Sequence, residues 1–461
     1  MRKLIYIISM LCVSCSVGQD YIPTNSYSDA TLAQNLNISE QKPLPQKWYT
    51  DFADLQLTTL VEQGLKNNTD VKTAILRIKQ ARAQLQITKV AALPQIGIKS
   101  GYNYEKQSKN IGPMAINSHY YSAGFTASWD IDLWGKNRRQ IEAERALLKA
   151  AKYTLENIKI LIVSEIIADY INLRQNAENL RLTEKNARLQ QEILATVKAK
   201  YDSGLADETA YSEAQYLLEN TRAQIPQYRA IIEQYYNALA TLVGILPDEL
   251  PLNIAEFKPI LTNKISTGRN LREFPASIVR LRPDVAAAEQ NLIAENALVG
   301  AAVAELYPNI SLSGLWGYAS QGGSKLIRSS SQTYNYAPLI SLPLLDWNRL
   351  QNNVRLQKYI KAEALANYKQ TVLDAVTEIK NAQTAYYENL SALQNRAKAL
   401  QNMRKAAQLT QKKYENGLIE FSQVVHTQQN LIAAEQDFVA INTQVLQSLT
   451  AFYKAVAAPV N

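Results

Sequence analysis

The chain has 461 residues, of which 20% are charged, and a formal net charge of +8 at pH 7. Its length leaves room for several ordinary domains. Lys and Arg are interspersed with Asp and Glu and form no basic stripe, so the charge indicates a solvated mixed surface and no nucleic-acid partner. The only cysteines, Cys12 and Cys15, offer no internal disulfide after export, and no later run of about 18 apolar residues predicts a transmembrane helix.

The first residues, 1–14, have the pattern of a secretory signal peptide. A basic start is followed by the apolar run Leu4–Val13, which is too short to span a bilayer. Cys15 follows a small residue, as in a bacterial lipobox, and this predicts a mature chain that begins at a lipidated Cys15. Cys12 stands where that motif prefers Leu, so an ordinary signal peptide with an incidental cysteine remains the alternative. The lipid would be the only attached group, because nothing in the sequence predicts another cofactor.

The remaining chain contains two homologous halves. YDSGL at Tyr201–Leu205 and YENGL at Tyr414–Leu418 lie 213 residues apart, and both follow heptad patterns in the same phase. An Asp–Val pair also precedes a proline by the same interval in both halves, at an offset of 214. We therefore expect a first structural repeat at 54–247 and a second at 273–455.

Each repeat is predicted to contain one helix, two strands and a pair of long helices. A helix from Asn137 to Tyr201 would be ~95 Å long, and heptads sustained over that length predict a coiled-coil-like neighbour. Two unrelated helices in a compact bundle would need more turn signals than the sequence contains. The expected helices are Asp54–Ala92, Asn137–Asp202 and Ala206–Val243, then Ser277–Tyr307, Leu350–Glu415 and Phe421–Ala455.

Four segments alternate apolar and polar residues with the period of a strand. Their tyrosines and tryptophans gather near the ends, and polar loops are expected at Glu105–Ser118 and Ser320–Thr333. The strands could belong to a soluble sandwich, but their length and aromatic ends favour an outer-membrane barrel. The segments are Ile96–Tyr104, Tyr121–Leu133, Ile310–Tyr318 and Tyr334–Leu344.

Four strands cannot close a barrel, and open strand edges are not tolerated in lipid. Several chains would therefore share one barrel. Two chains would give eight strands with an interior filled by side chains, whereas three would give twelve strands and leave a passage.

In these features the chain resembles the outer membrane efflux proteins of the TolC type. It is most similar to the lipoprotein branch that serves tripartite RND pumps. The resemblance covers nearly the whole mature chain, and its clearest stretches are CSVGQDY from Cys15, TRAQIP from Thr221 and LRPDVAAAEQNL from Leu281.

The resemblance implies a mixed α and β membrane protein that forms a homotrimer. Four strands per chain would build a twelve-stranded outer-membrane β-barrel, which would continue into a long periplasmic α-helical barrel. The lipidated segment 15–53, the connector 248–272 and the tail 456–461 would contribute to a belt around the helices. The protein would be anchored in outer membrane lipid and extend into the periplasm.

The implied function is a passive exit duct for small molecules. They would come from an inner-membrane RND-type pump through a periplasmic adaptor protein. One alternative is a type I-like duct for polypeptides. Another, of a different class, is a structural coiled-coil envelope lipoprotein, which would leave the alternating strands unexplained.

The sequence predicts neither a catalytic site nor a metal site. Its two histidines are His119, expected in an outer loop, and His426, expected near a helical tip. No HExxH or GxxxxGK motif is present, and the one CxxC, Cys12–Cys15, spans the predicted signal-peptide cleavage site, so no enzyme activity is expected.

The two hairpin tips are the predicted docking points for the adaptor. A tip presents unpaired backbone groups and a small apolar knob. The alternative is that the glycines only form the turns and the tyrosines only staple them. The candidate residues are Tyr201, Gly204, Leu205, Tyr414, Gly417 and Leu418.

The last candidate site is a gate on the helix after the second tip. The resembling family often carries VLDAQR there, with Asp and Arg lining a constriction, whereas this chain has VVHTQQ. His426 stands in place of the Asp and Gln429 in place of the Arg, with Ser422 one turn earlier. This departure puts an ionic gate in doubt. Either His426 packs between helices, or three His426 rings narrow the closed channel and respond to pH, since histidine titrates near neutrality.

Overall fold

The computed structural model describes residues 17–23, 47–106, 108, 110, 117–257 and 278–458. The signal sequence, Cys15 and much of the predicted belt lie outside these residues. The chain divides into two compact units. The first, called here the sheet unit, comprises Met1–Asn25, Leu76–Tyr153 and Ala286–Gln370. The second, the hairpin unit, comprises Ser26–Ile75, Thr154–Val285 and Thr371–Asn461.

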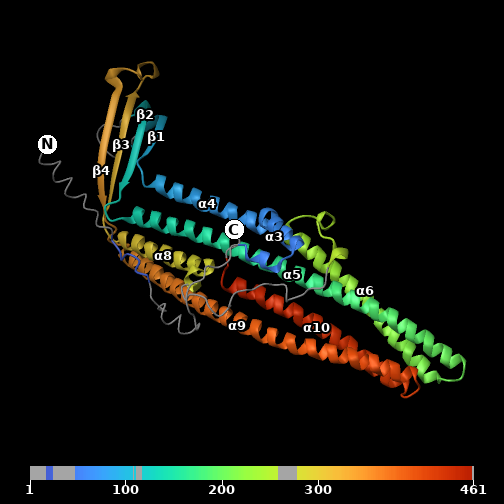
Figure 1. Cartoon of the computed structure of the whole chain (residues 1–461). Coiled ribbons are helices and arrows are strands. Elements are labelled where there is room, and N and C mark those ends of the chain that lie inside the picture. The colour runs from blue at the N-terminus through green and yellow to red at the C-terminus, as the bar shows by residue number, and fades with distance from the viewer. Residues whose placement is uncertain are drawn as a thin grey trace. The chain divides into compact units, whose positions relative to one another are not determined.

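A four-stranded antiparallel sheet dominates the sheet unit, with its strands in chain order (Figure 1). β2 and β3 pair at the centre, so the sheet joins the two repeats, and β1 and β4 are its edges. The strands are β1 Gln95–Lys106, β2 Asn117–Ile131, β3 Asn309–Ser320 and β4 Gln332–Ser341. The four predicted strands are therefore confirmed, with two differences in their bounds. β2 begins earlier than expected and places His119 opposite Tyr104 in the ladder instead of in a loop. β4 ends at Ser341 and not at Leu344, since Pro343 cannot donate to a strand ladder.

The strand register gathers most of the aromatic residues on one face of the sheet. Phe125 lies opposite Ile98 on one side and Trp316 on the other, and Trp316 lies opposite Tyr334. These side chains are exposed, Phe125 by 50% and Tyr334 by 67%. The opposite face carries small and polar residues, among them Thr126 and Ser128, as the period-two pattern predicts.

Gly124 and Gly317 face each other at the centre of the sheet. A Cβ added to Gly124 would lie 2.6 Å from the carbonyl oxygen of Trp316, and one added to Gly317 would lie 2.4 Å from that of Ala123. Only glycine fits this close approach of two backbones.

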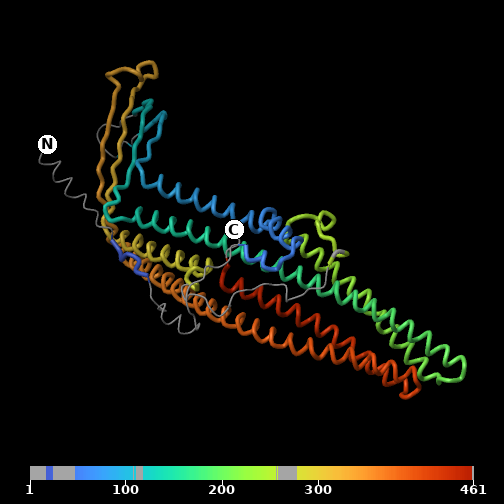
Figure 2. The backbone as a smooth tube through the Cα atoms, viewed as in Figure 1, coloured from blue at the N-terminus to red at the C-terminus, as the bar shows by residue number. Residues whose placement is uncertain are grey.

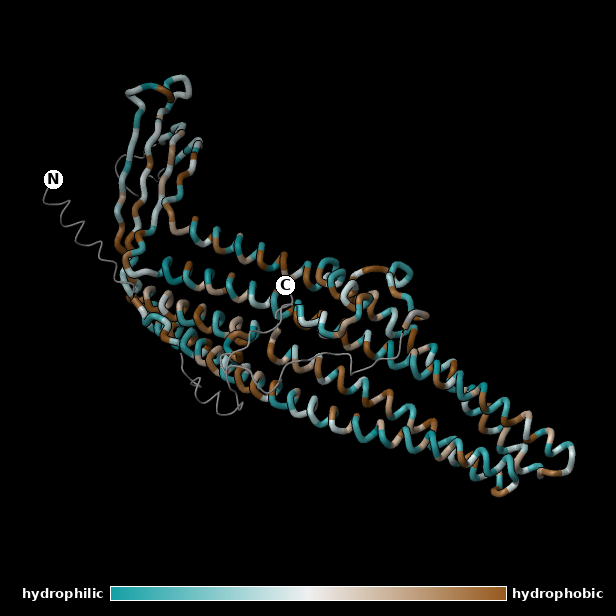
Figure 3. The backbone as a smooth tube through the Cα atoms, viewed as in Figure 1, coloured by the Kyte–Doolittle hydropathy of each residue, from teal (hydrophilic) through white to brown (hydrophobic). Residues whose placement is uncertain are grey.

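Two long helical hairpins follow the two strand pairs. Figure 2 traces their reversals, and Figure 3 shows hydrophilic and hydrophobic residues alternating along α5 and α9. The predicted boundaries are confirmed to within three residues. The helices are α5 Lys136–Asp202, α6 Glu208–Val243, α9 Trp347–Glu415 and α10 Phe421–Ala455.

The shorter helix that opens each repeat is broken in two, contrary to the prediction of continuous helices. Asn68 ends α3 and accepts hydrogen bonds from the N–H groups of Asp70 (2.8 Å) and Val71 (3.2 Å), so it caps α4. In the second repeat the break falls at Arg282, before Pro283. The pieces are α3 Leu55–Asn67 and α4 Thr69–Ala91, then α7 Ile278–Leu281 and α8 Pro283–Ala304. Short 3-10 turns complete the described elements at Trp48–Phe52, Pro247–Glu249, Ile254–Glu256, Gly323–Lys325 and Ser329–Ser331.

Both breaks perform the same task in the hairpin unit. The Asn68 amide donates to the carbonyl of Leu242 at 2.7 Å, in the last turn of α6. Arg282 donates to the carbonyl of Ala455 at 2.7 Å, in the last turn of α10. The donors are 214 residues apart and the carbonyls 213, so these are equivalent contacts of the two repeats. Each contact satisfies a carbonyl that a helix end leaves without an intrahelical partner.

Candidate docking tips and gate

The two hairpin tips have the same backbone geometry. Gly204 and Gly417 have φ values of 74° and 70°, a left-handed conformation that favours glycine and ends each long helix. In each turn the leucine N–H donates to the carbonyl of the lysine five residues earlier: Leu205 to Lys200 at 2.8 Å and Leu418 to Lys413 at 2.9 Å. The repeated YxxGL sequence therefore produces a repeated turn.

The six predicted tip residues divide into three pairs with different roles. Leu205 and Leu418 protrude, with 79% and 70% of their surfaces exposed. The tyrosines pack along their own hairpins instead. Tyr201 stacks on Tyr211 at a centroid distance of 5.5 Å, and Tyr414 contacts Phe421 at 5.2 Å. The glycines form the turns, and the leucines are the apolar groups available to a partner.

The two tips also contact each other within one chain (Figure 1). The Lys200 ammonium lies 4.3 Å from the ring centroid of Tyr414, a cation–π contact that the sequence pattern did not reveal. Burial, together with the charge of Asp207, raises the pKa of Tyr414 above its ordinary value. An apolar cluster lies beneath this contact and consists of Val197, Ala214, Leu217, Phe421, Val424 and Val425.

The candidate gate residues lie in the first turns of α10. His426 and Gln429 are exposed, and Ser422 is half-buried. Within one chain His426 therefore does not pack between helices, because the buried residues of this turn are Val424 and Val425. The structure of one chain brings the three gate residues to one end of α10 and leaves the histidine available to face another copy.

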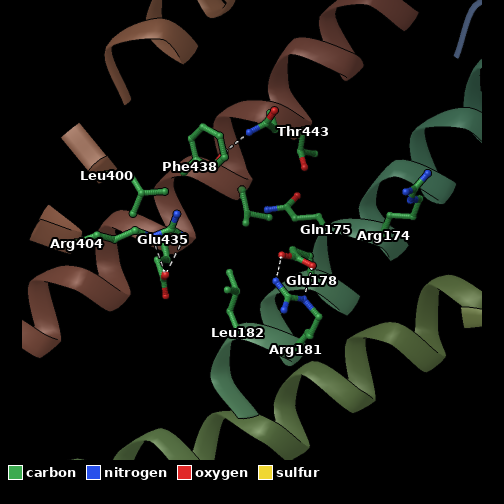
Figure 4. Close-up of a pocket in the computed structure, with 12 residues that line it drawn as sticks. Arg174, Gln175, Glu178, Arg181, Leu182, Leu400, Arg404, Glu435, Phe438 and Thr443 are labelled. Carbon is green, nitrogen blue, oxygen red and sulfur yellow. Dashed lines mark hydrogen bonds and ion pairs between the residues drawn. The ribbon is translucent and has the colours of Figure 1, made fainter. Parts of the chain in front are cut away.

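A charge cluster around the buried Glu435 joins the two hairpins farther from the tips. Figure 4 shows Arg404 of α9 and Glu435 of α10 facing each other beside a cavity of about 110 Å³, with Glu178 and Arg181 paired on α5. Glu435 has only 5% of its side chain exposed, accepts from Arg404 at 3.0 Å, and is 3.4 Å from the amide nitrogen of Asn186 on α5.

The sequence pattern did not single out this cluster, although Glu435 is a glutamate inside the expected helix Phe421–Ala455 and could have served as a signal. Its equivalent in the first repeat pairs Arg222 with Gln191 at 3.1 Å. Each hairpin thus carries a cross-helix polar link at the same level. The Arg404–Glu435 pair and the Asn186 contact therefore link α9, α10 and α5.

The N-terminal residues form a strap in the sheet unit. Gly18 has a φ of 101° and lies against Gly300, where an added Cβ would come within 2.7 Å of a backbone atom. Arg139, only 5% exposed, donates to the carboxylate of Asp20 at 2.7 Å and to the carbonyl of Gly18 at 3.1 Å. The N–H of Val17 donates to the carbonyl of Trp134, shortly after β2. These contacts hold the chain close to the base of β2 within two residues of Cys15.

Within the described part of the chain, no helix is long and apolar enough to cross a bilayer. No group of three or more His, Cys, Asp or Glu residues among the described positions is arranged to hold a metal ion.

Comparisons with known proteins cover nearly the whole chain. The family model described as "Outer membrane efflux protein" matches residues 60–245 and 275–458. The "Cation efflux system protein CusC" of Escherichia coli O6:H1 is 27% identical over 449 residues, covering 96% of this chain and 95% of that protein. "Nodulation protein T" of Rhizobium leguminosarum bv. trifolii is 26% identical over 92% of this chain and 90% of that protein.

Among solved structures, the outer-membrane channel OprN superposes with a TM-score of 0.90 at 28% identity. The match covers 96% of this chain and 99% of OprN. The predicted TolC-like fold class, with four strands per chain, long helices and two internal repeats, is confirmed by this agreement.

Proposed function

This chain belongs to the outer membrane efflux protein family, and we propose that it is the passive exit duct of a tripartite efflux system. As a family member it is an outer membrane efflux channel. The proposed duct receives small molecules from an inner-membrane RND-type pump through a periplasmic adaptor and performs no chemistry itself. This proposal rests on one observation: the same chain combines a sheet with an exposed aromatic face and two helical hairpins of matching length and turn geometry.

Conductance tests the channel directly. Purified protein inserted into a planar bilayer is expected to conduct ions, whereas a structural coiled-coil lipoprotein would not. In cells that lack their own channel, restored efflux of small molecules supports the duct. Restored secretion of a polypeptide without efflux would instead support the type I-like alternative.

The proposed assembly is a homotrimer with one shared barrel. β1 and β4 are the edges of the sheet, and their free backbone groups would each cost several kcal/mol in lipid. Three copies join β4 of one chain to β1 of the next and give twelve strands. Native mass spectrometry in detergent should show three chains. A stable monomer would contradict the argument that the sheet edges must pair between chains to close a barrel.

We place the adaptor contact at Leu205 and Leu418, because these large apolar side chains protrude at the tips. The variant Leu205→Asp/Leu418→Asp should abolish efflux and leave trimers in the membrane. Leu246→Asp, at an exposed leucine outside the tips, is the matched control and should retain efflux. Unchanged resistance in the double variant would show that these leucines do not dock the adaptor.

We also propose that Cys15 carries the N-terminal lipid. The strap that begins at Val17 holds the chain at the base of β2, where an acyl anchor can reach the membrane. Mass spectrometry of the N-terminal peptide is the test, with Cys15→Ser as the unmodified control. An unmodified Cys15 in protein extracted from membranes would rule out the lipid.

For the gate we propose that His426 faces its symmetry copies in the closed state. Protonated rings a few ångströms apart would repel by about 1 kcal/mol or more per pair even near water, so acid should loosen the constriction. Single-channel conductance from pH 7.5 to 5 should rise in the wild type and stay flat in His426→Ala. An equal pH response in both proteins would remove His426 from the gate.

A further inference from the structure

The tip sequences of the two repeats contain the same two residues that make the cation–π contact. Lys200-Tyr201 ends α5, and Lys413-Tyr414 ends α9 at an offset of 213. Within one chain only one combination is formed, Lys200 over the ring of Tyr414. The complementary combination is Lys413 with Tyr201.

A ring of three chains alternates first and second hairpins around its axis. The contact from the first hairpin to the second lies within a chain, and the contact from the second hairpin to the first lies between chains. Because the hairpins are homologous, both kinds of contact should use equivalent surfaces. We propose that Lys413 of each chain lies over the ring of Tyr201 of the partner subunit, an inference that rests on the trimer of the proposed function.

The isolated chain presents both partners of this contact on its surface. Lys413 is exposed, and Tyr201 is 39% exposed although its ring stacks on Tyr211 with an interplanar angle of 12°. Lys413 and Lys200 occupy equivalent positions in their turns, because the carbonyl of each accepts a hydrogen bond from the leucine N–H of its turn. The backbone of the two turns is therefore the same, and Lys413 and Tyr201 are both exposed, as the inferred contact requires.

The rest of the two seams is not equivalent in chemistry. The buried Val197, Leu217 and Phe421 of the seam within the chain correspond to Thr410, Asn430 and Glu208 at the seam between chains. Apolar packing is thus replaced by polar residues between copies. The lysine–tyrosine contact is the part of the tip interface that both seams share.

Crosslinking separates the two seams. The variant Lys413→Cys/Tyr201→Cys, treated with a short bismaleimide, should yield covalent dimers and trimers on denaturing gels. The matched variant Lys200→Cys/Tyr414→Cys should crosslink within the chain and remain monomeric on the gel. The unmodified chain has no cysteine after Cys15 and serves as the background control.

The outcomes distinguish this contact from the assembly on which it depends. Intact trimers in native mass spectrometry that give no covalent dimers, while the matched variant crosslinks internally, would overturn the Lys413–Tyr201 contact and leave the trimer standing. The absence of trimers would instead overturn the proposed assembly.

A second measurement does not require cysteines and tests the cation itself. Lys413→Met should lower the temperature at which trimers dissociate, whereas Lys413→Arg should preserve it, because guanidinium also binds aromatic faces. Equal behaviour of the Met and Arg variants would show that the positive charge is not part of the interface.

Discussion

Arg282 offers the most direct test of the equivalent contacts that Asn68 and Arg282 make with the last turns of α6 and α10. Its side chain is 8% exposed and donates to Ala455 at 2.7 Å, to Asp284 at 2.7 and 3.0 Å, and to Glu378 at 2.8 Å. Burial alone would lower the pKa of Arg282, but the hydrogen bonds and charges of Asp284 and Glu378 raise it overall, so the guanidinium stays charged. The substitution Arg282→Met keeps much of the packing and removes every donor.

Breaking a buried ion pair typically costs ~3–5 kcal/mol, and hydrogen bonds to charged groups contribute ~1.5–3 kcal/mol. Here the abandoned carboxylates can partly hydrate, since Asp284 is 26% and Glu378 51% exposed. We therefore expect Arg282→Met to lower the free energy of local unfolding by ~2–4 kcal/mol, mainly because the Ala455 carbonyl and the Asp284 carboxylate lose their donor.

Hydrogen exchange at the C-terminal turn of α10 measures this loss locally. Amides there should exchange roughly 30- to 900-fold faster in Arg282→Met, since ~1.4 kcal/mol corresponds to a factor of ten. Glu378→Gln removes only a half-exposed partner and should cost less than ~1 kcal/mol. If the amides exchange at the same rate in both variants, the Arg282 contact does not stabilise the end of α10. Its equivalence with the Asn68 contact would then be geometric only.

Two further outcomes follow from burial and close contact. Burial and then the charge of Glu165 raise the pKa of Asp169, so its carboxylate destabilises the fold at neutral pH. Asp169→Asn should raise the unfolding temperature at pH 7.5. This gain should vanish below about pH 4, where aspartate is protonated in both the folded and the unfolded state. An equal gain at both pH values would show that the ionised carboxylate does not cause the destabilisation. Gly124→Ala should cost ~1–3 kcal/mol through its clash with backbone and lower the dissociation temperature of the trimer, whereas Gly101→Ala, with nothing within 4 Å, should not.

Local patterns predicted the strands, the long helices and the turns, because each depends on neighbours in sequence. The period-two alternation of β2 and the glycines at 204 and 417 are of this kind. The breaks at Asn68 and Arg282 were missed despite local signals, an asparagine that caps α4 and a proline that restricts the residue before it.

The contacts that join the hairpins could not be read from local patterns. Lys200 and Tyr414 are 214 residues apart, and each is unremarkable alone. Glu435 looks like a solvated charge until α5 and α9 bury it. Similarly, the exposure of His426 depends on which face of α10 meets the chain's own helices, and that choice is made by tertiary packing.

The pairing of β2 with β3 also constrains the order in which the protein folds. The β1–β2 and β3–β4 pairs are hairpins of neighbouring strands, but β2 ends at Ile131 and β3 begins at Asn309. The central register, with its facing glycines, must therefore wait until residues 132–308 and β3 have been exported. Such a long-range pairing forms slowly, and until it does each hairpin keeps an open, apolar edge. Export of this chain should consequently depend on periplasmic factors that shield strand edges until the second repeat arrives.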